Sequence, residues 1–432
     1  MRVHLKTLGC RLNEAELESW ARDFRHQGFS ITNEASEADL VVVNSCAVTE
    51  EAVRKSRKLM RRTHRDNPNA KLVMSGCYAS LDPAQAAAEL GVDLLVANPD
   101  KERLVQLVTR KLQLPTMPAL AMEPAAQSLL GRNRQRAFIK VQDGCRYRCT
   151  YCIVTLARGD EHSRPIAEIV GEINQLAQAG IKEVVLAGVH LGGYGNGIDS
   201  SLEQLVACVL ADTDMPRIRL GSLEPWDLPR DFWGLFQNSR LMPHLHLPIQ
   251  SGADSVLQRM SRRCRTSEFQ ALIEDARAEV TDFNVTTDII VGFPGETDDE
   301  WRQTLDFVEQ LGFGHIHIFA YSRRQGTKAA ALSGQLPQPV KKQRSEALHQ
   351  LSARLKIQTL ERFRDRSFAV LVEGEPSLIA GEQSLSGYTP NYLRVSFPGQ
   401  EELKNQILPV RTHRLAGDRE QLLGSIQPPT GS

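Results

Sequence analysis

The sequence predicts an α/β protein in three parts: an N-terminal doubly wound parallel sheet, a central partial barrel of six β/α units, and a small C-terminal antiparallel β-barrel. Through the first two parts, strand-like apolar runs alternate with segments of helical period, which is typical of parallel strands joined by helical crossovers. In the last part the runs are short and separated by Gly and Pro turns, as in small barrels. We expect domains at residues 1–125, 131–365 and 366–427.

The composition restricts the kind of protein this is. Lys and Arg total 52 and Asp and Glu total 52, so any RNA-binding surface would be a local patch. No apolar run approaches the roughly 20 residues that cross a membrane, and the first residues lack a long apolar segment. We therefore expect a cytoplasmic protein with no membrane partner. In that reducing compartment the 8 cysteines are metal ligands, catalytic thiols or buried apolar residues rather than disulfides.

In the first part, each of three expected strands is followed closely by a cysteine. Residues 3–8 precede Cys10, residues 38–43 precede Cys46, and residues 71–74 precede Cys77; a fourth strand is predicted over residues 93–97. The carboxyl ends of parallel strands lie along one edge of a sheet, where ligands bind. The pattern therefore predicts a three-thiolate metal site, although any one of these cysteines alone would more often be a buried spacer.

A basic helix and a linker follow. The helix predicted over residues 52–65 carries seven Lys and Arg residues, which either form a solvated face or contact phosphate beside Cys46. Prolines and the loss of periodicity over about residues 110–136 indicate a domain boundary.

A second cysteine triplet, Cys145, Cys149 and Cys152, follows the strand predicted over residues 137–141. Structural zinc sites take four ligands, and the next candidates here are the distant His162 and Cys208. Three thiolates on a four-iron cluster leave one iron open for chemistry. The alternative is a zinc knuckle completed by His162.

Further strands complete six β/α units, with the site expected at the carboxyl-terminal mouth of the barrel. The loops there contain the glycine-rich segment that begins at Gly188, the pair Ser222 and Glu224 suited to ribose hydroxyls, and Gln250. The histidines of the expected strands lack metal-ligand spacing along the chain and are interpreted as structural or mouth-lining residues: His244, His246, His315 and His317.

At this point a resemblance can be stated, because several motifs coincide. They lie at residues 8–13, 44–49, 75–77, 144–152, 157–159, 246–252, 288–297 and 321–327. Together they resemble the methylthiotransferase family of radical S-adenosylmethionine (SAM) enzymes over nearly the whole chain. The first motif is most similar to the MtaB branch, which acts on N6-threonylcarbamoyladenosine at tRNA position 37. MiaB-type relatives act on N6-isopentenyladenosine, and RimO-type relatives on an aspartate of a ribosomal protein.

The resemblance implies two 4Fe–4S clusters, one on Cys145, Cys149 and Cys152 and one on Cys10, Cys46 and Cys77. The first would bind SAM and cleave it to a 5′-deoxyadenosyl radical that takes hydrogen from carbon 2 of the adenine. The second would carry the sulfur, and a second SAM would methylate it. The implied SAM-binding residues are Tyr151, Gly188, Ser222, Glu224 and Gln250.

The resemblance also implies partners: the tRNA anticodon stem-loop and a flavodoxin- or ferredoxin-type electron donor. The C-terminal barrel falls where the family carries an RNA-binding TRAM domain, so Tyr388, Tyr392 and Arg394 could stack on bases or meet phosphate, or simply form the barrel surface. A rival of another class is a zinc-binding RNA module without catalysis.

Overall fold

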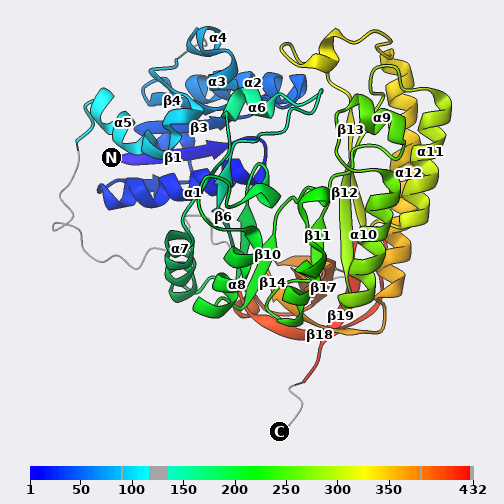
Figure 1. The fold of residues 1–432 in the computed structure, drawn as a ribbon. Helices are drawn as coiled ribbons and strands as arrows, with labels where there is room; N and C mark the ends of the chain where they lie inside the picture. The colour runs from blue at the N-terminus through cyan, green and yellow to red at the C-terminus, as the bar shows by residue number, and fades with distance from the viewer. Residues whose placement is uncertain (89–90, 116–134, 375, 380–381, 429–432) are drawn as a thin grey trace.

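The computed structural model places the N-terminal sheet beside the central barrel, with the C-terminal barrel beneath it (Figure 1). It describes residues 1–88, 91–115, 135–374, 376–379 and 382–428, so most of the predicted linker lies outside the described residues. Among the described residues, no helix is long and apolar enough to cross a membrane.

The N-terminal part is a five-stranded sheet of order β2-β1-β3-β4-β5 in which every pair is parallel. Alternate residues of the buried strand β3 face opposite sides: Leu40 and Val42 pack with Trp20 of α1, and Val41 and Val43 pack with Met60 of α2. Helices therefore cover both faces, and the doubly wound prediction is confirmed. Its elements are β1 Arg2–Thr7, α1 Arg11–His26, β2 Ser30–Thr32, β3 Leu40–Ser45, α2 Glu50–Asp66, β4 Lys71–Gly76, α3 Cys77–Leu81, α4 Pro83–Ala87, β5 Leu94–Val96 and α5 Leu104–Lys111.

The central part is an open barrel of six parallel strands in chain order, as predicted. Two three-stranded sheets, β6-β9-β10 and β11-β12-β13, are joined by parallel bridges between Ile218 and Leu241 and between Ser222 and His246. The elements are β6 Arg136–Lys140, β7 Gln142–Asp143, α6 Val154–Arg158, β8 His162–Ser163, α7 Ile166–Gln178, β9 Glu183–Ala187, α8 Leu202–Asp212, β10 Arg217–Leu220, β11 His244–His246, α9 Asp254–Arg259, α10 Thr266–Glu279, β12 Asn284–Val291, α11 Asp298–Leu311, β13 His315–Ala320 and α12 Gln338–Arg362.

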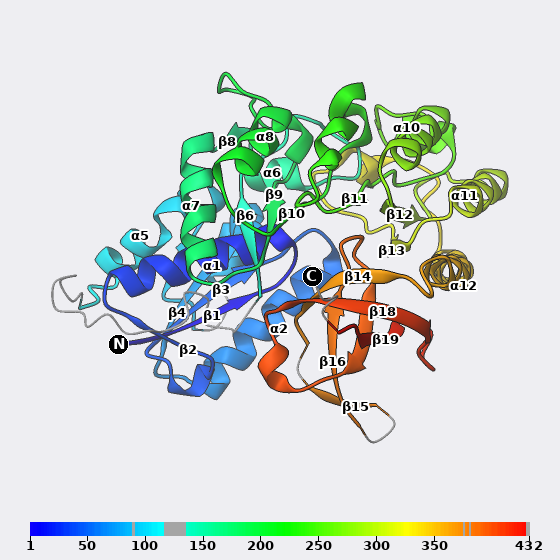
Figure 2. The ribbon, with the colours of Figure 1, turned by 90° about the horizontal axis from the view of Figure 1, so that it is seen from below.

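The C-terminal part closes into a five-stranded barrel, β14-β18-β19-β17-β16, with β15 added at its edge. All pairs are antiparallel except β17 with β19. The strands are β14 Ser367–Val372, β15 Ser377–Ile379, β16 Glu382–Tyr388, β17 Arg394–Pro398, β18 Ile407–Leu415 and β19 Leu422–Ile426. Figure 2 shows this barrel packed against the central one, between α2 and α12.

The C-terminal barrel covers the amino ends of the central strands. Arg217, the first residue of β10, donates to the backbone oxygens of Tyr388 and Thr389 at 3.1 and 2.9 Å. Asn284, the first residue of β12, donates to the oxygen of Asn391 at 2.8 Å. The carboxyl ends of the strands, where ligands bind in such barrels, are left for the two cysteine triplets.

Candidate active site

The central triplet lies on a loop fixed at several points to the carboxyl end of the barrel. The backbone N–H of Thr150 donates to the oxygen of Met260 at 3.0 Å, and the oxygen of Thr150 accepts from Ala329 at 2.8 Å. Cys145 is fixed at the other end, since its N–H donates to Gly159 at 3.2 Å. Segments more than 100 residues apart therefore hold the thiols at the mouth.

The chemistry of this triplet fits an iron–sulfur cluster. The pKa of the Cys145 thiol is raised to about 12 and that of Cys152 to about 11, first by burial and then by the neighbouring thiols and Glu224. A bound cationic cluster would offset this cost and hold the thiolates. Tetrahedral zinc would bring its sulfurs to about 3.8 Å from one another. Among the described residues, the sets of three ligand atoms within 4.8 Å include neither triplet, so both are too wide for one zinc ion.

His162 does not complete this triplet. Its side chain is exposed on β8, and its Nδ1 lies 3.5 Å from the oxygen of Asp160, two residues away. The zinc-knuckle alternative therefore loses its fourth ligand.

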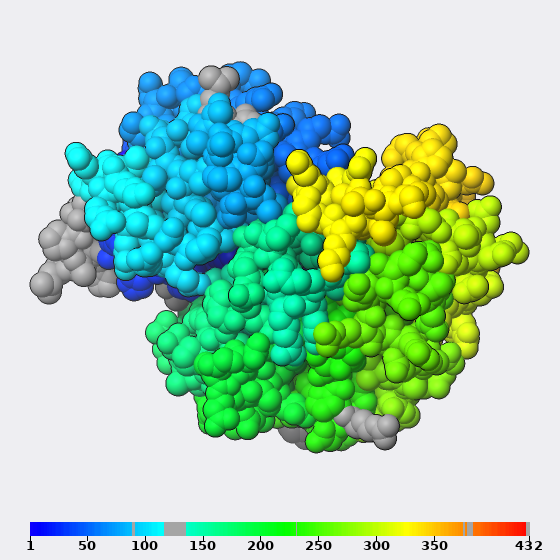
Figure 3. Space-filling model, turned by 45° about the horizontal axis from the view of Figure 1, so that its top comes forward, coloured from blue at the N-terminus to red at the C-terminus, as the bar shows by residue number. Residues whose placement is uncertain are grey.

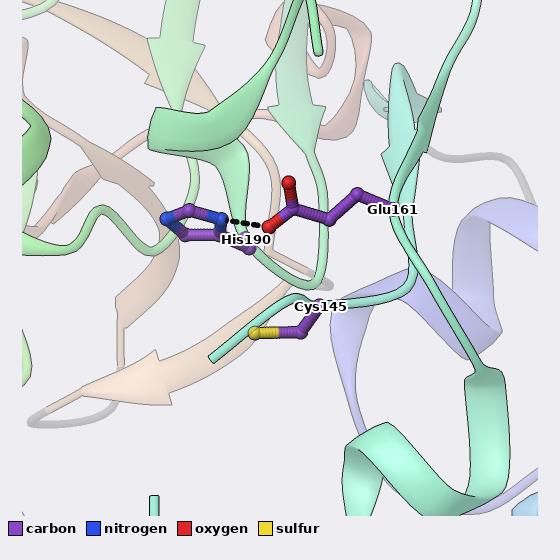
Figure 4. Close-up of side chains that lie close together, drawn as sticks. All are labelled: Cys145, Glu161 and His190. Atoms are coloured by element: carbon purple, nitrogen blue, oxygen red, sulfur yellow. Dashed lines mark hydrogen bonds and ion pairs between the residues drawn. The ribbon is translucent and has the colours of Figure 1, made fainter. Parts of the chain in front are cut away.

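A histidine that the sequence reasoning did not single out lies beside Cys145 (Figure 4). His190 is fully buried between two carboxylates, with Nδ1 at 2.5 Å from Glu161 and Nε2 at 2.5 Å from Asp227. The hydroxyl of Tyr147, within the triplet loop, donates to the same Asp227 at 2.9 Å. This chain of contacts joins the triplet loop to the loops after β9 and β10, so His190 acts as a positioning residue.

Of the five predicted SAM-binding residues, Gly188, Ser222, Glu224 and Gln250 follow central strands at their carboxyl ends, and Tyr151 lies within the triplet loop. Gly188 directly follows β9, and a Cβ atom there would approach Gln142 Oε1 to 2.8 Å. Glu224 accepts from Arg262 at 2.7 Å, and Arg262 Nη1 lies 3.8 Å from the sulfur of Cys149.

The other three predicted SAM-binding residues are Ser222, Gln250 and Tyr151. Ser222 is exposed after β10, and Gln250 adopts a left-handed backbone, φ 82°, while its N–H donates to Asp288 at 2.9 Å. Tyr151 packs against the small apolar cluster around Phe293 and Tyr321. Among these five residues, Glu224 is joined to the triplet through Arg262, and the SAM-binding role of the set stays a prediction.

The N-terminal triplet lies at the carboxyl ends of β1, β3 and β4, as the strand pattern predicted. The pKa of the Cys46 thiol is raised to about 11, first by burial and then by the nearby Cys77 and Cys10. Gly9, at φ 111°, allows Cys46 to approach, because a Cβ atom there would lie 2.9 Å from its sulfur. The buried Asn98 points its Nδ2 at Cys77 from 3.8 Å. Three thiols at the carboxyl ends of three neighbouring strands fit a second cluster.

A buried arginine of the central part supports this edge. Arg158, in the helix after the central triplet, donates to Asn13, Glu16 and Asp143 at 2.8, 2.9 and 2.9 Å. Lys101 contacts the other oxygen of Glu16 at 2.5 Å. Burial alone would raise the pKa of Glu16, but the charges of Lys101 and Arg158 outweigh it and hold that pKa well below its usual range. The network therefore ties the two triplet-bearing parts together.

A basic groove lies between α2 and the segment of the central part that contains Arg324. It has a volume of about 620 Å³ and contains Arg324 of the central part. Glu50 of α2 donates its N–H to Ser322 at 3.2 Å, and Figure 3 shows the yellow segment around these central residues against the blue N-terminal part. The Nε of Arg324 is buried without a hydrogen-bond partner among the described residues. The groove is lined by Glu50, Val53, Arg54, Arg57, Lys58, Arg61, Arg62, Arg65 and Arg324.

Two predicted RNA-contacting residues are engaged elsewhere. The rings of Tyr388 and Tyr392 stack at 4.9 Å, and the guanidinium of Arg136 lies over both at 5.3 and 5.0 Å. Because these rings face the base of the central barrel, base stacking by them is not supported. Arg394 is exposed on β17.

Known proteins resemble both parts that carry cysteines. Residues 2–97 match a family described as uncharacterized protein family UPF0004, and residues 139–308 match the radical SAM superfamily. The radical SAM methyltransferase TsrM of Kitasatospora setae shares the fold, with a TM-score of 0.55 at 17% identity, over 74% of this chain and 72% of that chain.

Relatives match over nearly the full length. A protein of Thermotoga maritima named threonylcarbamoyladenosine tRNA methylthiotransferase MtaB is 35% identical, over 92% of this chain and 91% of its own. The Bacillus subtilis protein of that name is 34% identical, over 95% and 93%. A tRNA-2-methylthio-N(6)-dimethylallyladenosine synthase of Methylacidiphilum infernorum is 31% identical, over 96% and 93%.

Proposed function

We propose that this chain adds a methylthio group to carbon 2 of N6-threonylcarbamoyladenosine at tRNA position 37. The premise is that the chain belongs to the radical SAM methylthiotransferase family. The observation that carries this is the full-length similarity to relatives named for that substrate. Family membership also sets aside the non-catalytic zinc module.

The cofactors are SAM and two 4Fe–4S clusters, and the residues present fit them. Cys145, Cys149 and Cys152 would hold one cluster, and the N-terminal triplet the other. When bound, the first supplies the electron that cleaves SAM and the second supplies the sulfur.

The chain's own residues bind and orient. Glu224, held by Arg262, and Ser222 suit the ribose hydroxyls of SAM, and Gly188 leaves room for Gln142 to pack against the backbone at the end of β9. His190 holds the triplet loop so that its thiols keep their positions. We place the reaction in the cytoplasm, with a flavodoxin- or ferredoxin-type protein as the electron donor.

Nucleoside mass spectrometry of tRNA from a deletion strain tests this function. We expect 2-methylthio-N6-threonylcarbamoyladenosine to disappear, N6-threonylcarbamoyladenosine to accumulate, and the gene to restore the product. Loss of the 2-methylthio derivative of dimethylallyladenosine instead would transfer the function to that substrate, for which other relatives are named. Unchanged tRNA would refute both.

The basic groove along α2 is our candidate surface for the tRNA backbone. Arg54 and Lys58 are exposed one turn apart on this helix, and Ser56 between them bonds both the N–H and the oxygen of Cys46 at 3.2 and 3.0 Å. Ser56 is on the buried face of α2, so a phosphate chain in the groove would lie across this helix from the N-terminal triplet.

Replacing Arg54 and Lys58 together with alanine should weaken tRNA binding and reduce the slope of log K against log salt by about 2, because two phosphate contacts are lost. SAM cleavage without RNA should not change. Lys342→Ala, on the exposed face of α12, is the matched control. An unchanged salt slope in the double variant would exclude this groove.

A further inference from the structure

Three polar side chains from three neighbouring strands meet at the open side of the central barrel. His246 of β11 lies 3.1 Å from Asp288 of β12, and Asp288 is the cross-strand neighbour of His317 on β13. One ligand atom from each lies within 4.8 Å of the others. None of the catalytic or SAM-binding roles described above uses these residues.

The three side chains differ in how many of their polar atoms already form hydrogen bonds or ion pairs. His246 is held at both nitrogens, by Thr286 at 2.9 Å and by Asp288 at 3.1 Å, so it is a positioning residue. His317 is exposed, and among the described residues its ring makes only edge-on contacts with His246 and His315, without a hydrogen bond. Asp288 Oδ2 is likewise without a hydrogen bond in the described part of the chain. The ring nitrogens of His317 and Oδ2 of Asp288 are therefore available to bond a ligand at this place.

A cation that forms no ion pair within the described part of the chain completes the group. Arg11 begins α1, which packs on β6 at the other edge of the open barrel, where Glu18 accepts from Phe138 at 3.2 Å. Among the described residues its guanidinium makes no hydrogen bond or ion pair and lies 5.8 Å from the ring of Tyr392. Tyr392 and His244 link Arg11 to this group: the Tyr392 ring lies 4.9 Å from His244, and Thr286 Oγ1 contacts both His244 at 3.2 Å and His246 at 2.9 Å.

Deeper in the same space, further donors surround Tyr392. Its ring lies 4.4 Å from the guanidinium of Arg219 and 4.9 Å from the ring of His244. Both residues are almost fully buried, and Arg219 Nη1 and His244 Nδ1 have no hydrogen-bond partner among the described residues. Such atoms are costly unless a ligand or water satisfies them.

The chemistry of this space fits a small anionic, hydroxylated group. An unpaired arginine and a histidine N–H are donors for a carboxylate, and a free carboxylate oxygen accepts from a hydroxyl. A threonylcarbamoyl group offers a carboxylate and a hydroxyl, whereas a dimethylallyl group offers neither. The location also fits, because Arg11 directly follows Cys10 of the N-terminal triplet.

We propose that Arg11, His317 and Asp288 form the subsite that binds the threonyl end of the N6 substituent and selects threonylcarbamoyladenosine over dimethylallyladenosine. This inference rests on the proposed function. A site built for polar groups rejects an apolar analogue strongly, because its donors are then left unpaired.

Equilibrium binding of anticodon stem-loops, followed by fluorescence anisotropy, tests the subsite without turnover. The position-37 base would be N6-threonylcarbamoyladenosine, its methyl ester, the dimethylallyl derivative or adenosine. We expect the wild type to bind the free acid about tenfold to a hundredfold more tightly than the other three. His317→Leu and Arg11→Gln should reduce that preference to near one while binding of the adenosine stem-loop stays unchanged.

The controls separate this proposal from the function. His317→Asn, which keeps an N–H donor, should retain part of the preference, and His413→Ala, an exposed histidine on β18, should retain all of it. Variants that keep the full preference would overturn the subsite alone. The proposed function would be overturned by two results together: the wild-type protein shows no preference among the stem-loops, and the deletion strain keeps its modified tRNA. Stoichiometric Mn²⁺ binding that His317→Leu abolishes, with the preference intact in that variant, would replace the subsite by a metal site.

Discussion

Replacing Cys145 with alanine should abolish both SAM cleavage and tRNA modification, whereas replacing Cys46 should end only the insertion of the methylthio group. The reason is that the two triplets lie on different parts of the fold, with separate backbone supports. In the Cys46 variant the central thiols and their Glu224–Arg262 pair are untouched. 5′-Deoxyadenosine and modified nucleosides, both quantified by mass spectrometry, measure the two outcomes.

Iron content and a cysteine outside both triplets are the controls. Each variant should fall from about eight to about four irons per chain, since one cluster is lost. Cys208→Ala, in α8, should keep full iron and both activities. Methylthiolated product from the Cys46 variant at the wild-type level would contradict the division of roles between the triplets.

Arg158→Met should lower the free energy of unfolding by about 3–5 kcal/mol, because removing one partner leaves buried carboxylates uncompensated. The side chains of Arg158 and Glu16 are both 2% exposed, and Asp143 is also buried. Urea unfolding measures the change. Arg302→Met is the matched control: its pair with Asp299 is exposed, so its loss should change stability by less than about 1 kcal/mol. Equal effects of the two substitutions would refute the network.

The loss of stability caused by Arg158→Met should depend on pH, because Glu16 belongs to the same network. The pKa of Glu16 is depressed below its usual 4.5 in the folded protein, so its stabilising contribution is complete above that value and is lost as pH falls below it. The difference between wild type and Arg158→Met should therefore shrink as pH falls below about 4.5.

The fold and both cysteine triplets could be predicted because their signals are local. Parallel strands alternate with helices, and each N-terminal cysteine follows a strand, which is enough to place Cys10, Cys46 and Cys77 at one edge. The central triplet carries its signal in its own spacing. The domain boundaries at residues 125, 131 and 365 stay predictions.

The partners of these residues could not be predicted, because their contacts join distant parts of the chain. Arg158 is 142 residues from Glu16, and His190 is 37 residues from Asp227. The assignment of His246 and His317 to structural roles relied on spacing along the chain, whereas the structure brings them together across strands. Arg324 joins the basic helix for the same reason.

The C-terminal barrel over the amino ends of the central strands affects the order in which small molecules exchange. With that end covered, SAM, its cleavage products and the target base all reach the triplets from the carboxyl end or the gap beside β13. If each modified tRNA consumes two SAM molecules, the second SAM must enter after the products of the first have left. Bound tRNA would obstruct this exchange, because it lies on the same route. The C-terminal barrel would then also control cofactor turnover, because it leaves SAM, its products and the tRNA a shared route.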